Sequence, residues 1–454
     1  MKRLLLLPFC LAGLVRAQAD SIAPDATNMS TQAATDFIKG MRVGWNVGNS
    51  LEATGGETAW SNPLVTQALI DSVKAAGFNS IRLPVAWSQF SDASTFTIKT
   101  AWLDRVEVVA NYALNRGMYV VLNEHWDGGW LQPTNAAKDA SNKELAAIWK
   151  QVAKRFRNYG DHLLFAGTNE VMVTNDYSTP SAEYQTVQNG FNQTFVKTVR
   201  ATGGRNAYRY LVFQTYNTNI NYGVSGTTVP TDPASKRLFV EVHYYDPYEF
   251  TLQDPTTYTQ WGPNAPDKTK VPTWGDEAYA DGQFGKMKSS FADKGVPFIV
   301  GEYGVIYRAS GCESCRITWD GYITGSIIKK GGVPFFWDNG YTTDKQMGVF
   351  NRANGTQAFP AVIKAIMDNA PAKADALAPV AVSGPGLSVR REAGALHLVR
   401  EGPAAMARVL DLRGRVEREF PVPSGSSSLP LGLLPQGVHI LRVDGDAPLR
   451  FLAD

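Results

Sequence analysis

Two glutamates that follow short apolar runs are the residues of this sequence best placed to do chemistry. Glu170 comes soon after the run 163–167, and Glu302 directly follows the run 298–301. A carboxyl beside a buried segment costs free energy unless it pairs or reacts. Two such carboxyls suit cleavage of a glycosidic bond, because one can protonate the leaving oxygen while the other meets the oxocarbenium-like carbon. The alternative is that each glutamate forms an ion pair with a lysine or arginine and has no catalytic role.

Polar residues follow the other apolar runs of the same region. The runs cover 41–47, 80–84, 119–123, 163–167, 210–215, 238–242, 298–301 and 333–336. The residues at or just beyond their ends are Asn46, Asn49, Arg82, His125, Trp126, Asn169, Glu170, Tyr216, Asn217, His243, Tyr245, Glu302, Tyr303, Trp337 and Asp338. In a barrel of parallel strands the carboxyl ends meet at one face, so we predict one shared site there.

Amphipathic stretches of helical length alternate with these runs. They cover 66–76, 103–116, 145–159, 184–202, 281–294 and 317–330. Many begin near Ser, Thr, Asp or Asn and end near Gly, as helices do. The alternation predicts an α/β protein with a (β/α)8 TIM barrel in the domain 20–370. A doubly wound open sheet is the alternative, but it usually has fewer strands and a phosphate loop, and neither GxGxxG nor GxxxxGKS/T occurs.

Other catalytic chemistries have weaker support in the sequence. His125 and His243 could bind a metal, but HExxH is absent and no third ligand stands at a telling spacing. A GxSxG motif for a serine nucleophile is absent too. We therefore predict an enzyme that uses no metal and no other cofactor.

The first residues have the pattern of an export signal, which we predict to cover 1–19. Lys2 and Arg3 precede the apolar stretch 4–14, and Ala17-Gln18-Ala19 is a small-x-small cleavage site. The apolar stretch is too short to span a bilayer. We therefore expect a secreted, extracellular protein without membrane insertion.

Charge and cysteine content fit export. Removing the signal removes three basic residues and no acidic one, so the net charge changes from +2 to −1 and gives no reason to expect nucleic acid as a partner. Cys10 leaves with the signal, and Cys312 and Cys315 remain. An oxidising destination favours a disulfide between them, with free thiols or a functional pair as the alternatives.

Composition changes near residue 372. All 11 Trp lie between Trp45 and Trp337, and no Tyr occurs beyond Tyr341. We predict a linker over 371–380 and a small β-rich, sandwich-like domain over 381–454, because short alternating runs such as 396–399 and 438–443 are broken by Gly and Pro. The segments 409–416 and 433–443 resemble the C-terminal sorting domains of some secreted bacterial proteins. A carbohydrate-binding module is the alternative, although such a module usually displays a row of aromatic residues.

Several motifs within 36–370 resemble glycoside hydrolase family 5 endoglucanases, and they occur in that family's order. They are GWNVGNSLE (44–52), ETAW (57–60), AGFNSIRLPVAW (76–87), TNE (168–170), HYY (243–245), GEYG (301–304) and FW (336–337). The resemblance implies retaining cleavage, with Glu170 as acid/base and Glu302 as nucleophile. The family's other nearly invariant positions map onto Arg82, His125, Asn169, His243, Tyr245 and Trp337.

The resemblance also implies a role for each supporting residue. Arg82 and Tyr245 should hydrogen-bond Glu302, and Arg82 should lower the pKa of that carboxyl. His243 should lie beside Glu170, whose pKa must be raised if it is to stay protonated.

The remaining supporting residues should meet the sugar. Asn169 should hold its 2-hydroxyl and His125 should hydrogen-bond it. Trp337 should lie under its apolar face. Because family members commonly carry a cis peptide after this tryptophan, we predict one between Trp337 and Asp338.

Further substrate contacts are less specific. Asn46, Trp60, Trp126 and Trp130 are candidates, and ordinary packing is the alternative for each tryptophan, as it is for Trp87, Trp261 and Trp274. Three residues depart from the family pattern. Val171 stands where Pro is usual, Thr168 precedes Asn169-Glu170, and Glu124 adds a charge directly before His125.

These observations predict a monomeric endo-β-1,4-glucanase with a β-glucan polysaccharide as its substrate. The same machinery acting on xyloglucan, mixed-linkage glucan or mannan is the first alternative. A catalytically inactive glycan-binding protein is the second, and the presence of both glutamates and every supporting residue argues against it.

Overall fold

The computed structural model describes residues 20–125, 127–371, 382–384, 387–392, 395–401, 403–411, 414–430, 434, 437–444 and 449–453. The predicted signal peptide, Trp126 and all but the first residue of the predicted linker lie outside the described residues. Within the described helices, none combines the length and the apolar character needed to cross a membrane.

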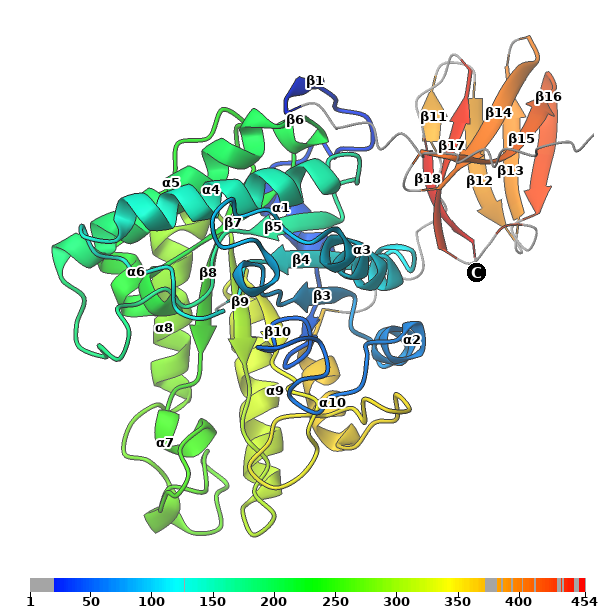
Figure 1. The fold of residues 1–454 in the computed structure, drawn as a ribbon. Coiled ribbons are helices and arrows are strands. Elements are labelled where there is room, and N and C mark those ends of the chain that lie inside the picture. Colours follow the sequence, from blue (N-terminus) through cyan, green and yellow to red (C-terminus); the bar gives the residue numbers. More distant parts are fainter. Residues whose placement is uncertain are drawn as a thin grey trace, which may run out of the picture.

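Eight parallel strands close into a barrel, and all eight predicted runs contribute one strand each (Figure 1). The strands are β2 (Gly44–Asn46), β3 (Ser80–Leu83), β4 (Tyr119–Asn123), β5 (Leu163–Ala166), β7 (Leu211–Gln214), β8 (Leu238–Tyr244), β9 (Phe298–Tyr303) and β10 (Val333–Phe336). Their order around the barrel follows the chain, and β10 pairs with β2 to close it. The predicted (β/α)8 fold is confirmed.

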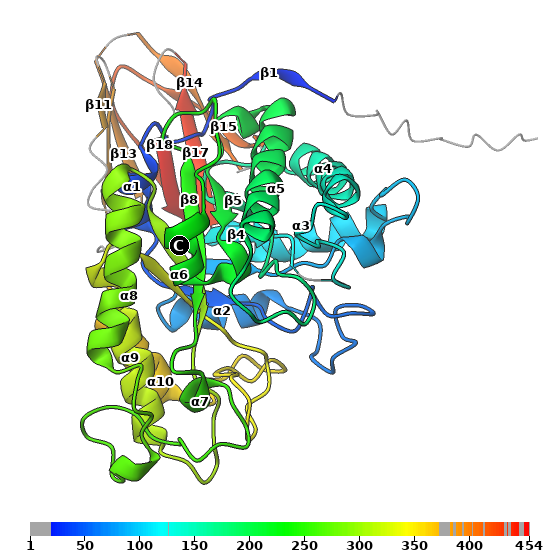
Figure 2. The same cartoon turned by 90° about the vertical axis from the view of Figure 1, so that its left-hand side faces the viewer.

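The six predicted helices are present outside the barrel, as Figures 1 and 2 show. They are α2 (Gln67–Ala75), α3 (Thr100–Leu114), α4 (Lys138–Arg155), α5 (Ala182–Ala201), α8 (Glu277–Ser290) and α9 (Glu313–Lys329). Thr66, Ser181 and Asp276 cap α2, α5 and α8, each accepting a hydrogen bond from a main-chain N–H of the first turn. Helices that the periodicity did not predict are α1 (Ala34–Phe37), α6 (Ile220–Gly226), α7 (Tyr248–Thr251) and α10 (Pro360–Asn369).

In most barrel strands, alternate side chains belong to two different apolar clusters. On β4, Val120 and Leu122 belong to the large cluster that includes the surrounding helices, whereas Val121 belongs to a separate cluster drawn from six barrel strands and α1. The second cluster fills the barrel interior, and Phe37 of α1 stacks on Tyr210 with ring centroids 3.9 Å apart. Because the interior is packed with apolar side chains, the polar residues gather at the carboxyl ends of the strands.

A short two-stranded sheet and a disulfide complete the catalytic domain. Strands β1 (Ile22–Pro24) and β6 (Gly203–Gly204) pair in parallel. Cys312 and Cys315 form the predicted disulfide where α9 begins.

The C-terminal region has its own β architecture. One antiparallel sheet contains β11 (Val382–Gly384), β12 (Leu387–Glu392), β13 (Ala395–Arg400) and β16 (Gly425–Pro430). The other contains β14 (Ala405–Leu410), β15 (Val416–Val422), β17 (Gly437–Val443) and β18 (Leu449–Ala453). Residues from both sheets, such as Leu398 and Val409, share one apolar cluster. The predicted small sandwich-like domain is therefore confirmed.

The predicted cis peptide between Trp337 and Asp338 is wrong. The cis bonds among the described residues are Asp246–Pro247 and Asp254–Pro255. Beyond the end of β10 the main chain continues to pair with its neighbours, since Trp337 N–H donates to the Tyr303 carbonyl at 2.9 Å and the Asp338 carbonyl accepts from Gly48 N–H at 3.0 Å. These bonds hold the trans peptide in place on both sides.

Candidate active site

Glu302 lies on β9, is buried, and has a polar partner at each oxygen of its carboxylate. Its side chain is 7% exposed, and one oxygen is 2.9 Å from Arg82 Nη1. Tyr245 donates its hydroxyl to the other oxygen at 3.0 Å. Arg82 comes from β3 and Tyr245 directly follows β8, so strands from different parts of the sequence fix both oxygens of Glu302. Fixed rotamers of this kind suit a nucleophile.

A second buried carboxylate, Glu241, lies between Arg82 and His243 and was not predicted from the sequence. Its Oε1 is 2.8 Å from Arg82 Nε and 3.2 Å from His243 Nε2. Gly301 makes room for it, because a Cβ on this residue would come within 1.9 Å of the same oxygen. The signal available in the sequence was the lone charge inside the run 238–242, since a charge inside a buried strand requires a partner.

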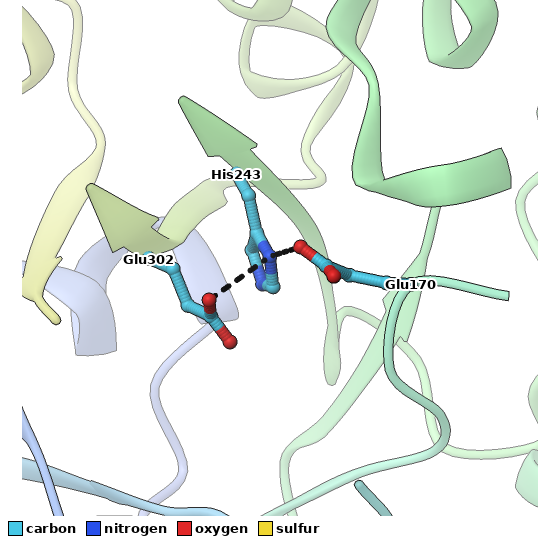
Figure 3. A group of neighbouring side chains, drawn as sticks. All are labelled: Glu170, His243 and Glu302. Atoms are coloured by element: carbon cyan, nitrogen blue, oxygen red, sulfur yellow. Dashed lines mark hydrogen bonds and ion pairs between the residues drawn. The ribbon is translucent and has the colours of Figure 1, made fainter. Parts of the chain in front are cut away.

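Glu170 has a different environment, in the segment that follows β5, which is not adjacent to β9 in the barrel. Its backbone has a φ of 46°, in the left-handed region that non-glycine residues rarely adopt. Its side chain is 42% exposed, and its Oε1 lies 2.7 Å from His243 Nδ1. Figure 3 shows His243 between the two glutamates, contacting Glu170 closely and Glu302 at 3.7 Å.

The carboxylates of Glu170 and Glu302 are close together. Oxygen atoms of the two side chains and a ring nitrogen of His243 all lie within 4.8 Å of one another. This separation is near the value of about 5–5.5 Å typical of retaining glycosidases and well below the roughly 6.5–9.5 Å of inverting ones. A sugar carbon can therefore meet Glu302 while its leaving oxygen faces Glu170.

His243 is a cation in this arrangement. Burial lowers the pKa of its imidazole, but the charges of Glu302 and hydrogen bonds to Glu170 and Glu241 raise it to about 9. Both ring nitrogens then carry protons and each faces a carboxylate. Glu170, His243 and Glu302 are the one group in the described part of the chain with metal-like spacing, and a metal there would have to displace a proton from the imidazole.

The pKa shifts of the two glutamates are opposite to the prediction, and each has a different cause. Burial raises the pKa of Glu170, but the hydrogen bond and charge of His243 outweigh it and leave the pKa below its ordinary value. For Glu302, burial raises the pKa, and the charges of His243 and Arg82 offset this only in part. The predicted raised pKa of Glu170 is therefore wrong for the free site, because the imidazolium bonds this carboxyl directly. Arg82 does lower the pKa of Glu302 as predicted, but burial outweighs it and the net direction is upward.

Three further predicted residues border the same site. Asn169 accepts a hydrogen bond from Arg82 Nη2, and its amide nitrogen lies 3.4 Å from His125 Nε2. Burial and the charges of Arg82 and His243 hold the pKa of His125 well below its usual range, so it is neutral. The half-buried ring of Trp337 faces His125, with centroids 5.9 Å apart and planes within 9° of parallel.

The residues predicted as possible further substrate contacts differ in how exposed they are. Asn46 is fully buried, accepts from Arg82 Nη1 at 3.1 Å and donates to the Gly301 carbonyl at 2.8 Å, so it supports Arg82 instead of facing the substrate. Trp60 is 37% exposed, and Trp130 lines a cavity beside Glu170. Trp126 lies outside the described residues.

The other weighed tryptophans have mostly structural contacts. Trp87 and Trp261 are buried, and their indole N–H groups donate to the carbonyls of Asn123 and Gly275. Trp274 is 39% exposed and donates to Glu249 at 3.3 Å.

Comparison with known proteins agrees with the fold and the site. The family model described as Cellulase (glycosyl hydrolase family 5) matches residues 45–343. The xyloglucan-specific endo-β-1,4-glucanase BoGH5A of Bacteroides ovatus is 42% identical over 382 residues, which covers 78% of this chain and 73% of that protein. Endoglucanase A of Paenibacillus barcinonensis is 38% identical over 371 residues, covering 76% of this chain and 92% of that protein.

Solved structures extend the likeness to three dimensions. A Bacteroides ovatus GH5 xyloglucanase in complex with a XXXG heptasaccharide has a TM-score of 0.74 and 41% identity, covering 78% of this chain and 80% of that one. A GH5-4 broad specificity endoglucanase from Ruminococcus champanellensis with bound cellotriose has a TM-score of 0.69 and 34% identity, covering 75% and 100%. The chain belongs to the cellulase family, glycosyl hydrolase family 5. It is a glycoside hydrolase of the endo-1,4-β-glucanase type.

Proposed function

We propose that this enzyme cleaves internal β-1,4 bonds of glucans, xyloglucan included, with retention of configuration. The observation that carries the proposal is the separation of at most 4.8 Å among the oxygens of Glu170 and Glu302 and the nitrogen of His243. This gap is too narrow for a water molecule to attack between a carboxylate and the sugar, so Glu302 itself attacks.

The proposed reaction has two steps. In the first, a Glu302 oxygen bonds to the anomeric carbon, the glycosidic C–O bond breaks, and the leaving oxygen takes a proton from Glu170. In the second, water attacks the anomeric carbon, gives a proton to Glu170 and releases Glu302. Arg82 and Tyr245 keep Glu302 oriented for both steps through their contacts of 2.9 and 3.0 Å.

His243 supplies the proton that Glu170 needs. In the free site the proton lies in the 2.7 Å hydrogen bond, on the imidazolium side. When Glu302 forms the glycosyl ester it loses its negative charge, and the electrostatic reason for His243 to remain a cation weakens. During this first step the proton moves along the bond to Glu170 as Glu170 passes a proton to the leaving oxygen. Glu170 is then a carboxylate beside a neutral imidazole, ready to accept the proton of the attacking water in the second step.

The remaining roles follow from position. Asn169 and His125 would hydrogen-bond the sugar at the point of cleavage, and Trp337 would offer its ring to the apolar face of that sugar. Trp130 and Trp60 are proposed as further sugar contacts, since Trp130 lines the cavity beside Glu170 and Trp60 is exposed in the segment between β2 and α2.

The choice of glycan is supported by the relatives. One relative is named as xyloglucan-specific and others as broad-specificity endoglucanases. Xyloglucan and unbranched β-1,4-glucans have the same β-1,4-linked glucose backbone. We therefore propose that branched and unbranched β-1,4-glucans are both substrates, ahead of mannan.

We also propose that the protein is exported and acts as an extracellular monomer. The support is the basic, apolar and small-residue pattern of residues 1–19. A role for the C-terminal domain in sorting is proposed on its sequence motifs, and a carbohydrate-binding module is the second candidate.

Two measurements test the proposal. NMR of early products should show the β-anomer first, and α-anomer at the outset would mean inversion. Product profiles on xyloglucan, carboxymethylcellulose, mixed-linkage β-glucan and β-mannan should show oligosaccharides from the first two. Turnover of mannan alone would overturn the proposed substrate class.

A further inference from the structure

A cavity of about 270 Å³ lies beside Glu170, between the segments that follow β4 and β5. Trp130 and Tyr177 contribute aromatic side chains to its lining, and Glu124 and Asp127 contribute carboxyls. Tyr177 is 80% exposed, so one aromatic ring stands free at the edge of the cavity. The reaction proposed above uses none of these four residues except Trp130 as a general sugar contact.

Glu124 is the unusual member of this group. The residue is 1% exposed, and neither of its carboxyl oxygens has a hydrogen-bond partner among the residues that the structure describes. Asp127, in contrast, accepts from the Trp130 indole N–H at 2.7 Å and from Gln89 N–H at 3.1 Å. Buried polar groups are almost always paired, so an unpaired carboxyl that lines a cavity points to a partner that enters with a ligand.

Burial supports a neutral form of Glu124. Burial and the nearby negative charges of Asp127 and Glu144 raise the pKa of this carboxyl well above its ordinary value. A neutral carboxyl can both donate and accept hydrogen bonds, as a sugar hydroxyl does. A cation is a poorer fit, because these acids do not form a group with metal-like spacing among the described residues.

The lining residues also indicate which half of the substrate the cavity faces. Glu170 and the residues directly after it line the cavity, whereas Glu302, Arg82 and Tyr245 do not. In the proposed mechanism Glu170 protonates the leaving oxygen, so the sugar unit that departs is the one next to this wall. The cavity is below the roughly 300–1,000 Å³ range of pockets for drug-sized ligands, which suits one sugar ring.

We propose that this cavity is a leaving-group-side subsite for a single pendant pyranose, the xylosyl branch of xyloglucan. Glu124 hydrogen-bonds the hydroxyls of that sugar, and the rings of Trp130 and Tyr177 pack against its apolar faces. The inference rests on the proposed function, because it assigns a specificity-determining residue to the same reaction.

The test compares substrates that differ in what occupies the leaving-group side. One is a xyloglucan oligosaccharide of two heptasaccharide repeats, which places a xylosylated glucose on the leaving-group side when the bond between the repeats is cleaved. The other is the nitrophenyl glycoside of one heptasaccharide, which leaves the cavity empty. For Glu124→Ala, we expect kcat/KM on the first substrate to fall by about tenfold more than on the second, since hydroxyl recognition is lost.

Matched variants separate recognition from folding. Glu124→Gln can still donate and accept and should recover most of the selectivity. Glu144→Gln neutralises a neighbouring acid that does not line the cavity, and should leave the ratio of the two kcat/KM values unchanged. Tyr177→Ala alters an exposed side chain, and should lower the same ratio by about threefold even if Glu124→Ala fails to fold.

The outcomes are distinguishable. Equal losses on both substrates for Glu124→Ala and Tyr177→Ala, or no loss for either, would overturn the inference while the wild-type enzyme still cleaves β-1,4-glucans. A wild-type enzyme that cleaves none of the β-glucans would instead overturn the proposed function.

Discussion

The surroundings of Glu302 and Glu170 differ although the two carboxyls lie within a few ångströms. Glu302 lies within β9, where the register with β8 shifts by one residue, is 7% exposed and receives hydrogen bonds on both oxygens. Glu170 follows the end of β5, has a left-handed backbone, is 42% exposed and has one close partner, His243. The proposed nucleophile is therefore held from several strands, and the proposed acid/base is held by a single group that can exchange a proton.

The difference matches what the two steps require. A nucleophile must stay in one position and keep its charge until it attacks, and fixed donors accomplish this. An acid/base must change protonation twice in each cycle, and an exposed carboxyl next to a titratable imidazole can do so. The left-handed backbone at Glu170 is a costly conformation of the kind found at functional sites.

Replacing the fixed carboxylate should have the largest effect. Glu302→Gln removes the atom that forms the glycosyl ester while keeping size and shape, so we expect kcat to fall by at least about 10⁴-fold with glycan binding retained. Steady-state kinetics and binding titration measure both. Activity within a few fold of the wild type would remove Glu302 from the nucleophile role.

Replacing the proton-exchanging carboxylate should have a smaller and substrate-dependent effect. Glu170→Gln should lower kcat/KM on polysaccharide by about 10²–10⁴-fold, the usual contribution of general acid catalysis. On a dinitrophenyl glycoside, whose leaving group needs no proton, the first step should be nearly as fast as in the wild type. Equal losses on both substrates would contradict the assignment of Glu170.

The aromatic ring that faces His125 should come next. Trp337→Ala should lower kcat/KM by about 10- to 100-fold if the ring stacks on the sugar. Because Trp337 is only half-buried, the melting temperature should fall by a few degrees at most. Lost stability with retained turnover would show instead that the ring serves only to pack the barrel.

The protonation of His243 predicts a pH dependence of stability. Its pKa in the folded protein is about 9, above the ordinary value of 6.5. The stabilisation is fully present below pH 6.5 and is lost as pH rises through about 9, because the unfolded imidazole loses its proton first. The free energy of unfolding should fall more steeply across this range in the wild type than in His243→Gln. Parallel curves from denaturant titrations would mean that His243 is not the shared cation.

The smallest effect is expected from removing the C-terminal domain. Both glutamates belong to a barrel with its own apolar clusters, and the tail has a separate one. A chain ending at Ala374 should therefore keep kcat/KM on soluble glucan within about twofold. Failure of this chain to fold would show that the tail is part of the catalytic unit.

Local patterns were sufficient to predict most of the fold. The eight β-branched runs each became a barrel strand, because alternate residues pack inward and outward in a barrel and only apolar ones suit both places. Helices such as α6 and α10 were missed: α6 has seven residues, and α10 follows a loop rather than a predicted strand. The cis peptide was also predicted wrongly, because it depended on a family habit and not on the contacts of this main chain.

The sequence by itself determined which residues reach the site. Strand alternation and the polar residues at strand ends place Glu170, Glu302 and Arg82 at one face, whatever the loops do. Only the tertiary structure decided which charged side chains lie next to one another in the site. Glu241 and Gly301 lie on neighbouring strands. The absence of a side chain at Gly301 leaves room for the Glu241 carboxylate, which contacts both Arg82 and His243. This arrangement depends on the register of the two strands, which no local sequence pattern specifies. Electrostatic interactions change over a few ångströms, so the lowered pKa of Glu170 followed from where His243 lies and the raised pKa of Glu302 from its burial, and neither from which residues are present.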